Sequence, residues 1–208
     1  MPDRLRRLWD FDDLEASEQR LREQLDAEQT DSGRAEVLTQ LARVQSLSGE
    51  FDACEELVQE AESLAGDSAI AKVRIDLERG RKLRSSGDAA ASVPFFESAF
   101  TRAVEKRLYY LAGDAAHMVA IADESKMLAW TRRGLDLADA EPDAAYWAGP
   151  LLNNLGWHYF EAGDYETALA TFERALEVRE RDPTNPDAIA FAREAVESAL
   201  KALGRESS

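Results

Sequence analysis

The two histidines of this chain are the first residues to consider as reactive groups, because each has a carboxylate three positions away. Asp114 precedes His117, and Glu161 follows His158. Residues three apart share a helix face, so each pair could bind a metal ion or transfer protons. This spacing is common, however, and the chain has no nucleophile elbow, phosphate-binding loop or metalloprotease motif. We therefore expect two ordinary, partly buried histidines, and neither catalysis nor a bound metal or cofactor.

Four arginines form a second candidate group: Arg43, Arg74, Arg81 and Arg84. The last three fall within about 80° of one another on one helix, and we expect Arg43 to approach them on the same exposed surface. A guanidinium group binds a carboxylate through two parallel hydrogen bonds, so such a patch suits an acidic peptide or a chain terminus. The alternative is that the arginines pair with local carboxylates, such as Glu36 and Glu78, and only keep the face soluble.

Amides and aromatic rings form a third group: Tyr109, Asn153, Asn154 and Trp157. Amide groups form hydrogen bonds with a peptide backbone, and aromatic rings offer apolar faces to a ligand side chain. The alternative for Trp157 is packing against the next helix. These residues and the four arginines are our candidates for a ligand-binding surface.

Helices must position all these residues. Only six prolines and 11 glycines occur among 208 residues, and the segments between them are rich in Ala, Leu, Glu and Arg, which favour helices. Apolar residues recur three and four positions apart, as at Ala168, Phe172 and Ala175, and no segment alternates as a strand does. The sequence therefore predicts an all-α fold.

One pattern of residues occurs several times along the chain, which indicates an array of repeats. Its copies place a small residue where two helices must touch: Ala42, Gly80, Ala115 and Gly156. Phe96 and Phe172 occupy equivalent positions later in two of the copies, where we expect them to fill the space against the following unit. One helix pair cannot bury its own apolar face, so the copies must stack on one another.

Each copy has the pattern of two helices joined by a tight turn. In three copies a glycine follows the first helix, at Gly49, Gly87 and Gly163, where it suits the left-handed backbone that ends a helix. Asp88 and Asp164 come next and are placed to open the second helix. The copy that contains the sequence DAAHM has no glycine at its turn.

Residues 152–183 resemble a tetratricopeptide repeat, because they carry its signature of Leu-Gly, Tyr, Gly-Asp-Tyr, Ala, Phe, Ala and a late Pro. The whole chain is also similar to uncharacterised bacterial tetratricopeptide proteins that have segments like DAAHM and LLNNLGW. This resemblance implies a right-handed superhelix of antiparallel helix pairs. We expect four pairs in a single domain, at residues 33–66, 70–105, 106–140 and 144–182.

Capping helices are expected at both ends of the array, within residues 1–32 and 183–208. We place them at about residues 12–28 and about 186–203, because both segments have helical periodicity. Ser17, Leu21 and Leu25 are the expected inward-facing residues of the first.

The resemblance also implies a function. In this family the first helices of successive units line a concave groove, and our arginine, asparagine and aromatic candidates fall on those helices. The expected function is therefore that of an adaptor or scaffold that binds a protein or peptide, with the arginines selecting an acidic one. Of the family's carboxylate-clamp positions only Asn154 is matched, which argues against recognition of chaperone tails.

Composition narrows the partners and the compartment. Forty-one acidic and 25 basic residues give a formal charge of −16, which repels nucleic acid and anionic membrane surfaces. Cys54 is the single cysteine, so no internal disulfide can form. No segment has the pattern of a secretory signal or a membrane-spanning helix, and we expect the protein in the cytoplasm.

Three other functions are compatible with the sequence. A repeat array with an exposed end face can stack on itself, which would make the protein a homo-oligomer. A secretion-type chaperone would also be acidic, helical and cytoplasmic. A metal-dependent enzyme is the third alternative, and it depends on the two histidine pairs alone.

Overall fold

The computed structural model describes residues 3–182 and 185–205 of the chain. Ten α-helices and two short 3-10 helices occur in these ranges, with no strand, so the predicted all-α class is confirmed. Their bounds are η1 (Arg6–Leu8), α1 (Leu14–Ala27), α2 (Asp31–Leu47), α3 (Phe51–Leu64), α4 (Ala69–Ser85), α5 (Ala89–Glu105), α6 (Tyr109–Ala122), α7 (Glu124–Ala140), η2 (Pro142–Trp147), α8 (Ala148–Glu161), α9 (Tyr165–Glu180) and α10 (Pro186–Ala202).

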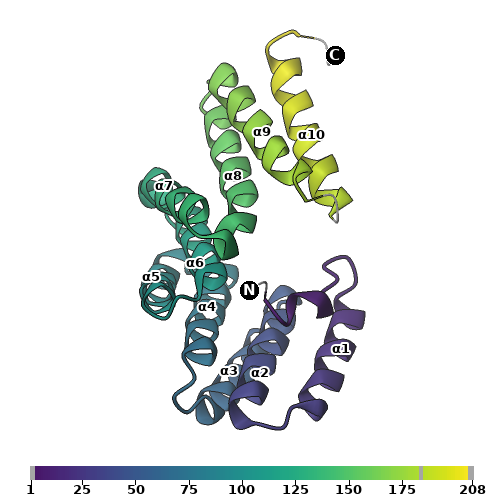
Figure 1. Ribbon diagram of the computed structural model, residues 1–208, viewed down its shortest axis with the longest axis vertical. Helices are drawn as coiled ribbons and strands as arrows, with labels where there is room; N and C mark the ends of the chain where they lie inside the picture. The colour runs from purple at the N-terminus through teal and green to yellow at the C-terminus, as the bar shows by residue number, and fades with distance from the viewer. Residues whose placement is uncertain (1–2, 183–184, 206–208) are drawn as a thin grey trace. The chain divides into compact units, whose positions relative to one another are not determined.

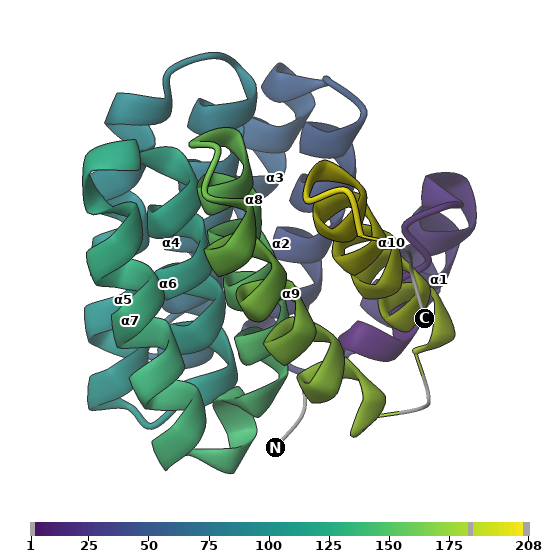
Figure 2. The same ribbon diagram turned by 90° about the horizontal axis from the view of Figure 1, so that it is seen from above.

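The helices form two compact units, Met1–Met127 and Leu128–Ser208, which we call the N-terminal and C-terminal units. Within the first, α2 packs against α3 and α4 against α5, and α1 covers α2 (Figure 1). Within the second, α8 packs against α9 and α9 against α10 (Figure 2). Antiparallel helix pairs are therefore the building block of each unit. The predicted boundary at residue 183 lies outside the described residues.

The turns inside the helix pairs have the backbone that the glycine pattern predicts. Gly49, Gly87 and Gly163 have φ angles of 81°, 99° and 80°, so each lies in the left-handed region. The side chain of Asp88 accepts a hydrogen bond from the backbone N–H of residue 91, and that of Asp164 accepts one from residue 167. Both aspartates are thus N-caps, as predicted.

Two glycines allow the helices of a pair to approach closely. A Cβ at Gly80 would lie 2.4 Å from the ring of Phe96, and one at Gly156 would lie 2.4 Å from the ring of Phe172. Both rings are fully buried. The small residue of the first helix and the aromatic residue of the second therefore form one packing unit. The repeat pattern predicted the close approach at both glycines, but it placed the two rings against the following unit.

The core of the N-terminal unit extends beyond the repeats into the segment before them. Leu21 of α1 is fully buried in the same apolar cluster as Leu38 and Leu41 of α2. Ser17 is buried and Leu25 packs against this cluster, as predicted. Leu5, which precedes α1 by several residues, is only 1% exposed and belongs to the cluster as well. The segment around Leu5 is therefore part of the packed structure.

None of the helices in the described ranges combines the length and the apolar character that a membrane crossing needs.

The left-handed turn after α8 provides a first test of the fold. We expect Gly163→Val to lower the free energy of unfolding by about 2 kcal/mol, because a β-branched residue is strained at positive φ. A Cβ at this position would meet no atom within 4 Å, so the loss measures backbone strain alone. Gly163→Asn is the matched control and should cost less, because asparagine tolerates this region. Urea unfolding followed by circular dichroism gives both values, and equal losses would contradict the prediction.

Candidate functional site

The N-terminal unit carries polar residues at the same spacing on two neighbouring helices. Because positions three, four and seven apart share a helix face, these residues form one continuous surface. We call it the inner face, and it consists of Glu36, Gln40 and Arg43 of α2 with Arg74, Glu78 and Arg81 of α4. Three of the four predicted arginines therefore lie on one surface, as the repeat pattern indicates.

Arg81 lies at the centre of a buried group of charges. Its Nη1 donates to Glu78 Oε1 at 2.5 Å, and its Nη2 donates to both carboxylate oxygens of Asp114 on α6, at 2.6 and 2.5 Å. Arg81 is 8% exposed, Glu78 1% and Asp114 5%. We expected Arg81 on an exposed surface, and this part of the expectation is wrong. Its charge is balanced inside the protein by Asp114 and by Glu78, one of the local carboxylates named above as an alternative partner.

The pKa values of this group follow from burial and from the neighbouring charges. Burial raises the pKa of Glu78, and the attraction of Arg81 does not reverse this effect. Burial also opposes ionisation of Asp114, but the charges of Arg81 and Arg43 outweigh it and lower the Asp114 pKa. The arginine–aspartate pair is therefore ionised across the neutral pH range, and it joins α4 to α6.

The other predicted arginines have different surroundings. Arg74 is 4% exposed, and its Nη2 donates to Asp3 Oδ1. Arg43 is half-buried, and burial together with the charge of Arg81 lowers its pKa. Arg84 lies on the exposed part of α4. The structure thus places Arg43 close enough to Arg81 for their charges to interact, whereas Arg84 is exposed to solvent. A ligand role for these four residues stays a prediction.

The chain's own N-terminal segment contacts four residues of the inner face, Glu36, Gln40, Arg43 and Arg74. Besides the bond from Arg74 to Asp3, Trp9 Nε1 donates to Gln40 Oε1 at 3.0 Å. The guanidinium of Arg43 lies over the ring of Trp9, 5.4 Å from its centroid. Figure 1 shows this purple segment running beside α2 before it turns into α1. These contacts were not predicted from the sequence, because residues 1–32 were expected only to contain a capping helix.

The two histidines lie in ordinary helical surroundings. Burial lowers the pKa of His117 to about 4, so this imidazole is neutral at pH 7. His158 packs edge to face against Tyr159, with ring centroids 5.7 Å apart. Among the described residues, no group of three or more His, Cys, Asp or Glu side chains is placed to hold a metal ion.

The two aromatic candidates, Trp157 and Tyr109, have different surroundings. Trp157 makes edge-to-face contacts with Phe160 and Phe172, at centroid distances of 5.2 and 5.1 Å. It therefore packs into the core of the C-terminal unit, as the alternative for this residue proposed. Tyr109 begins α6 in the N-terminal unit and is half-buried.

Asn153 and Asn154 line a groove between α8 and α10, and their predicted role in ligand binding stays a prediction. The groove has a volume of about 250 Å³. We call it the α8–α10 groove, and its lining includes Gly149, Pro150, Asn153, Asn154, Arg179 and Phe191. Asn153 Oδ1 is buried and receives no hydrogen bond from any donor in the described part of the chain. Arg179 was not among the residues predicted from the sequence, because it lies on α9, the second helix of its pair.

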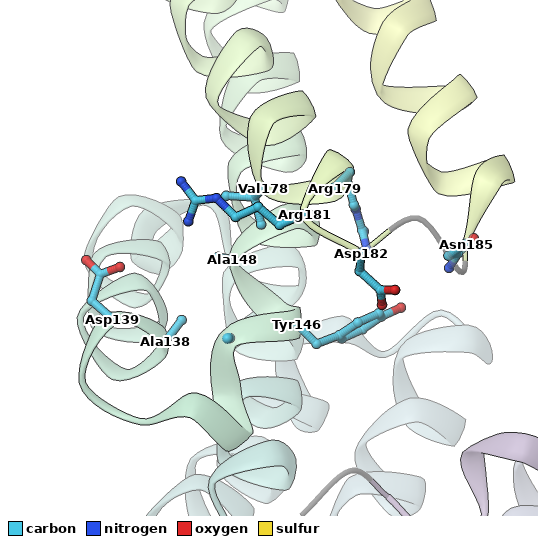
Figure 3. Close-up of a pocket in the computed structure, with 10 residues that line it drawn as sticks. Ala138, Asp139, Tyr146, Ala148, Val178, Arg179, Arg181, Asp182 and Asn185 are labelled. Atoms are coloured by element: carbon cyan, nitrogen blue, oxygen red, sulfur yellow. The ribbon is translucent and has the colours of Figure 1, made fainter.

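Arg179 also borders a second cavity of about 320 Å³, beside η2 and the end of α9. Its guanidinium lies over the ring of Tyr146, 5.2 Å from the centroid. In Figure 3, Arg179 and Asp182 reach toward Tyr146, while Arg181 is directed to the side where Asp139 lies. Gly149 makes room for this arginine, since a Cβ there would lie 2.5 Å from Arg179 Nε. Arg179 therefore contributes a positive charge to both cavities.

Comparisons with known proteins agree with this architecture. Residues 150–182 match the family model of the tetratricopeptide repeat. The fold is similar to that of a solved structure described as BtubC (BKLC) from P. vanneervenii, with a TM-score of 0.63 and 19% identity. That alignment covers 97% of this chain and 85% of the other. No match was found among curated proteins. Residues 150–182 thus form a repeat of the tetratricopeptide type within an all-α fold of packed helix pairs, and such a repeat supports a general role in interactions with other proteins.

Proposed function

We propose that this tetratricopeptide-type chain is a non-catalytic adaptor that binds an acidic peptide in the α8–α10 groove. The observation that carries the proposal is the position of Arg179, a half-buried guanidinium in that groove. Arg179 forms no ion pair with a carboxylate of the described residues, although the chain carries a formal charge of −16. A peptide carboxylate would supply the missing partner.

The tyrosine beside Arg179 supports the same function. Stacking of the guanidinium over Tyr146 restricts its orientation and leaves its N–H edges free to bind a planar carboxylate. Arginine is preferred for such bidentate recognition, because its donors are held in a fixed fork. The groove therefore favours a peptide with an aspartate, a glutamate or a terminal carboxylate.

The asparagine in the groove supports binding of a peptide backbone. The buried Asn153 Oδ1 has no hydrogen-bond donor among the described residues, and leaving such an acceptor unpaired costs about 1–3 kcal/mol. A peptide N–H that donates to this oxygen would recover that cost. Phe191, which is 56% exposed on α10, adds an apolar contact at the edge of the groove.

A charge reversal in α9 tests this proposal. The full-length chain is used to probe an array of synthetic peptides, each printed as an acidic form and as the matched form with Asn and Gln in place of Asp and Glu. Acidic peptides that bind are then titrated against wild type and Arg179→Glu. We expect the reversal to weaken binding at least about tenfold, which corresponds to about 1.4 kcal/mol. Binding should also weaken as salt rises.

The control is Arg174→Glu, the same charge change on an exposed position of the same helix outside the groove. It should leave affinity within about a factor of two, since exposed substitutions change stability by only about 0.5 kcal/mol. Equal losses in both variants would show that net charge alone attracts the peptides. Binding of the neutral forms as tightly as the acidic forms would contradict the role of Arg179.

A further inference from the structure

The contacts of residues 3–11 with the inner face are those of a bound peptide. The Asp3 carboxylate accepts a hydrogen bond from the buried guanidinium of Arg74 on α4, and only 9% of the Asp3 side chain is exposed. Leu5 fills an apolar site, and the Trp9 indole N–H donates to Gln40 on α2. A charged anchor, an apolar anchor and an aromatic anchor are thus spaced along a segment of turns whose only helix is the three-residue η1.

The segment leaves donors on the inner face unpaired. Asp3 accepts from Arg74 through Nη2, while the buried Nε of Arg74 has no acceptor among the described residues. The same is true of the buried Nε of Arg43, which lies over the rings of Trp9 and Phe11. A carboxylate that approached Arg74 through both oxygens would pair Nε as well as Nη2. The chain's own segment is therefore an incomplete partner for these two arginines.

We infer that the inner face is a second peptide site, and that residues 3–11 are an internal ligand which a partner peptide replaces. The partner carries a carboxylate, an apolar residue two positions later and an aromatic ring four positions after that, as do Asp3, Leu5 and Trp9. This inference is independent of the α8–α10 groove, which lies in the other unit.

The N-terminal segment competes with any partner peptide for the inner face, because it is covalently joined to the protein that it occupies. A ligand joined to its site by a short segment has an effective concentration of about millimolar, so it blocks weak ligands and yields only to tighter ones. The partner's advantage is a bidentate bond to Arg74 in place of the single bond that Asp3 makes. The exposed part of the segment, where Phe11 is 44% exposed, offers a place for displacement to begin.

The test uses the full-length chain and a fluorescent synthetic peptide with the sequence of residues 3–13, acetylated at its N-terminus. Three proteins are titrated by fluorescence anisotropy: wild type, a released variant with Asp3→Ala and Trp9→Ala, and a control with Arg7→Ala and Asp12→Ala. The control positions lie in or next to the same segment but are exposed. We expect the released variant to bind the probe at least about tenfold more tightly than wild type or the control. A probe with Asp3→Lys and Trp9→Ala should not bind.

Equal affinities for all three proteins would overturn the inference, as would absence of binding to a released variant of unchanged helix content. If the released variant loses helix content, hydrogen exchange on wild type decides instead. Excess unlabelled probe should speed exchange in the N-terminal fragment of the protein and leave α2 unchanged. Unchanged exchange would show that the segment is a permanent part of the core.

One more variant distinguishes binding at the inner face from binding in the α8–α10 groove. Adding Arg179→Glu to the released variant should leave probe affinity unchanged, because the probe binds the inner face. A loss of affinity would place the probe in the α8–α10 groove and overturn this inference while leaving the proposed function intact.

Discussion

Replacement of Asp114 by alanine is expected to lower the free energy of unfolding by about 3–5 kcal/mol, because it leaves a buried charge without its main partner. Asp114 accepts two hydrogen bonds from Arg81 Nη2, and both residues are less than a tenth exposed. Glu78 alone would then balance Arg81, although burial raises the Glu78 pKa and disfavours its ionised form. The loss should appear in urea unfolding followed by circular dichroism.

The control for this change is Asp136→Ala, which removes an exposed carboxylate from a helix and should cost no more than about 0.5 kcal/mol. The pH dependence gives a second check. The folded-state pKa of Asp114 is lowered, so its contribution is present above the unfolded pKa and is lost as pH falls through the folded value. The difference between wild type and Asp114→Ala should therefore shrink in acid. A loss below about 1 kcal/mol at neutral pH would show that this ion pair adds little.

Phe172→Ala is expected to destabilise the C-terminal unit by a similar amount, about 3–5 kcal/mol, because it removes a fully buried ring and leaves a cavity. The ring lies against Gly156 and within 5.1 Å of the centroid of Trp157. Loss of these contacts should also change the fluorescence of Trp157. Thermal unfolding followed by circular dichroism and by fluorescence measures both effects.

The glycine opposite this ring makes the prediction more specific. Gly156→Ala in the wild-type chain should be destabilising, because the new Cβ would lie 2.4 Å from the Phe172 ring. In the Phe172→Ala background the same change should be neutral or should stabilise by up to about 1 kcal/mol, since alanine favours helix over glycine. Additive effects of the two substitutions would contradict direct packing of the ring on the glycine.

Much of the fold could be predicted from the order of residues, because its determinants are local. The left-handed turn at Gly163 follows from a glycine after an apolar helix, and the N-cap at Asp164 follows from its position next to that turn. Gly156 could be identified as a point of close helix approach because the repeat pattern places a small residue there, although its contact with Phe172 was not predicted. Helix ends and pairings within a repeat depend on neighbours that are close in sequence.

The candidate sites were predicted less completely, because their properties depend on contacts between distant segments. The helical period predicted Arg43 and Arg81 on one exposed surface, and it could not show that Asp114 of α6 lies beside Arg81 and buries it. Asn153 and Asn154 were found from the groove positions of the resembled family. Arg179 was missed, because it reaches the groove from a second helix, past a glycine that leaves space for it.

The sequence by itself determined the helical class, the turns and the small residues at which the helices of a pair approach closely. Only the tertiary structure decided which charges are exposed and which surface is already occupied. An arginine on a helix face is equally compatible with solvent and with a carboxylate from another helix, and the difference depends on burial. The N-terminal segment shows this most clearly, since Asp3 and Arg74 are far apart in the chain and meet only when α2 and α4 form the inner face.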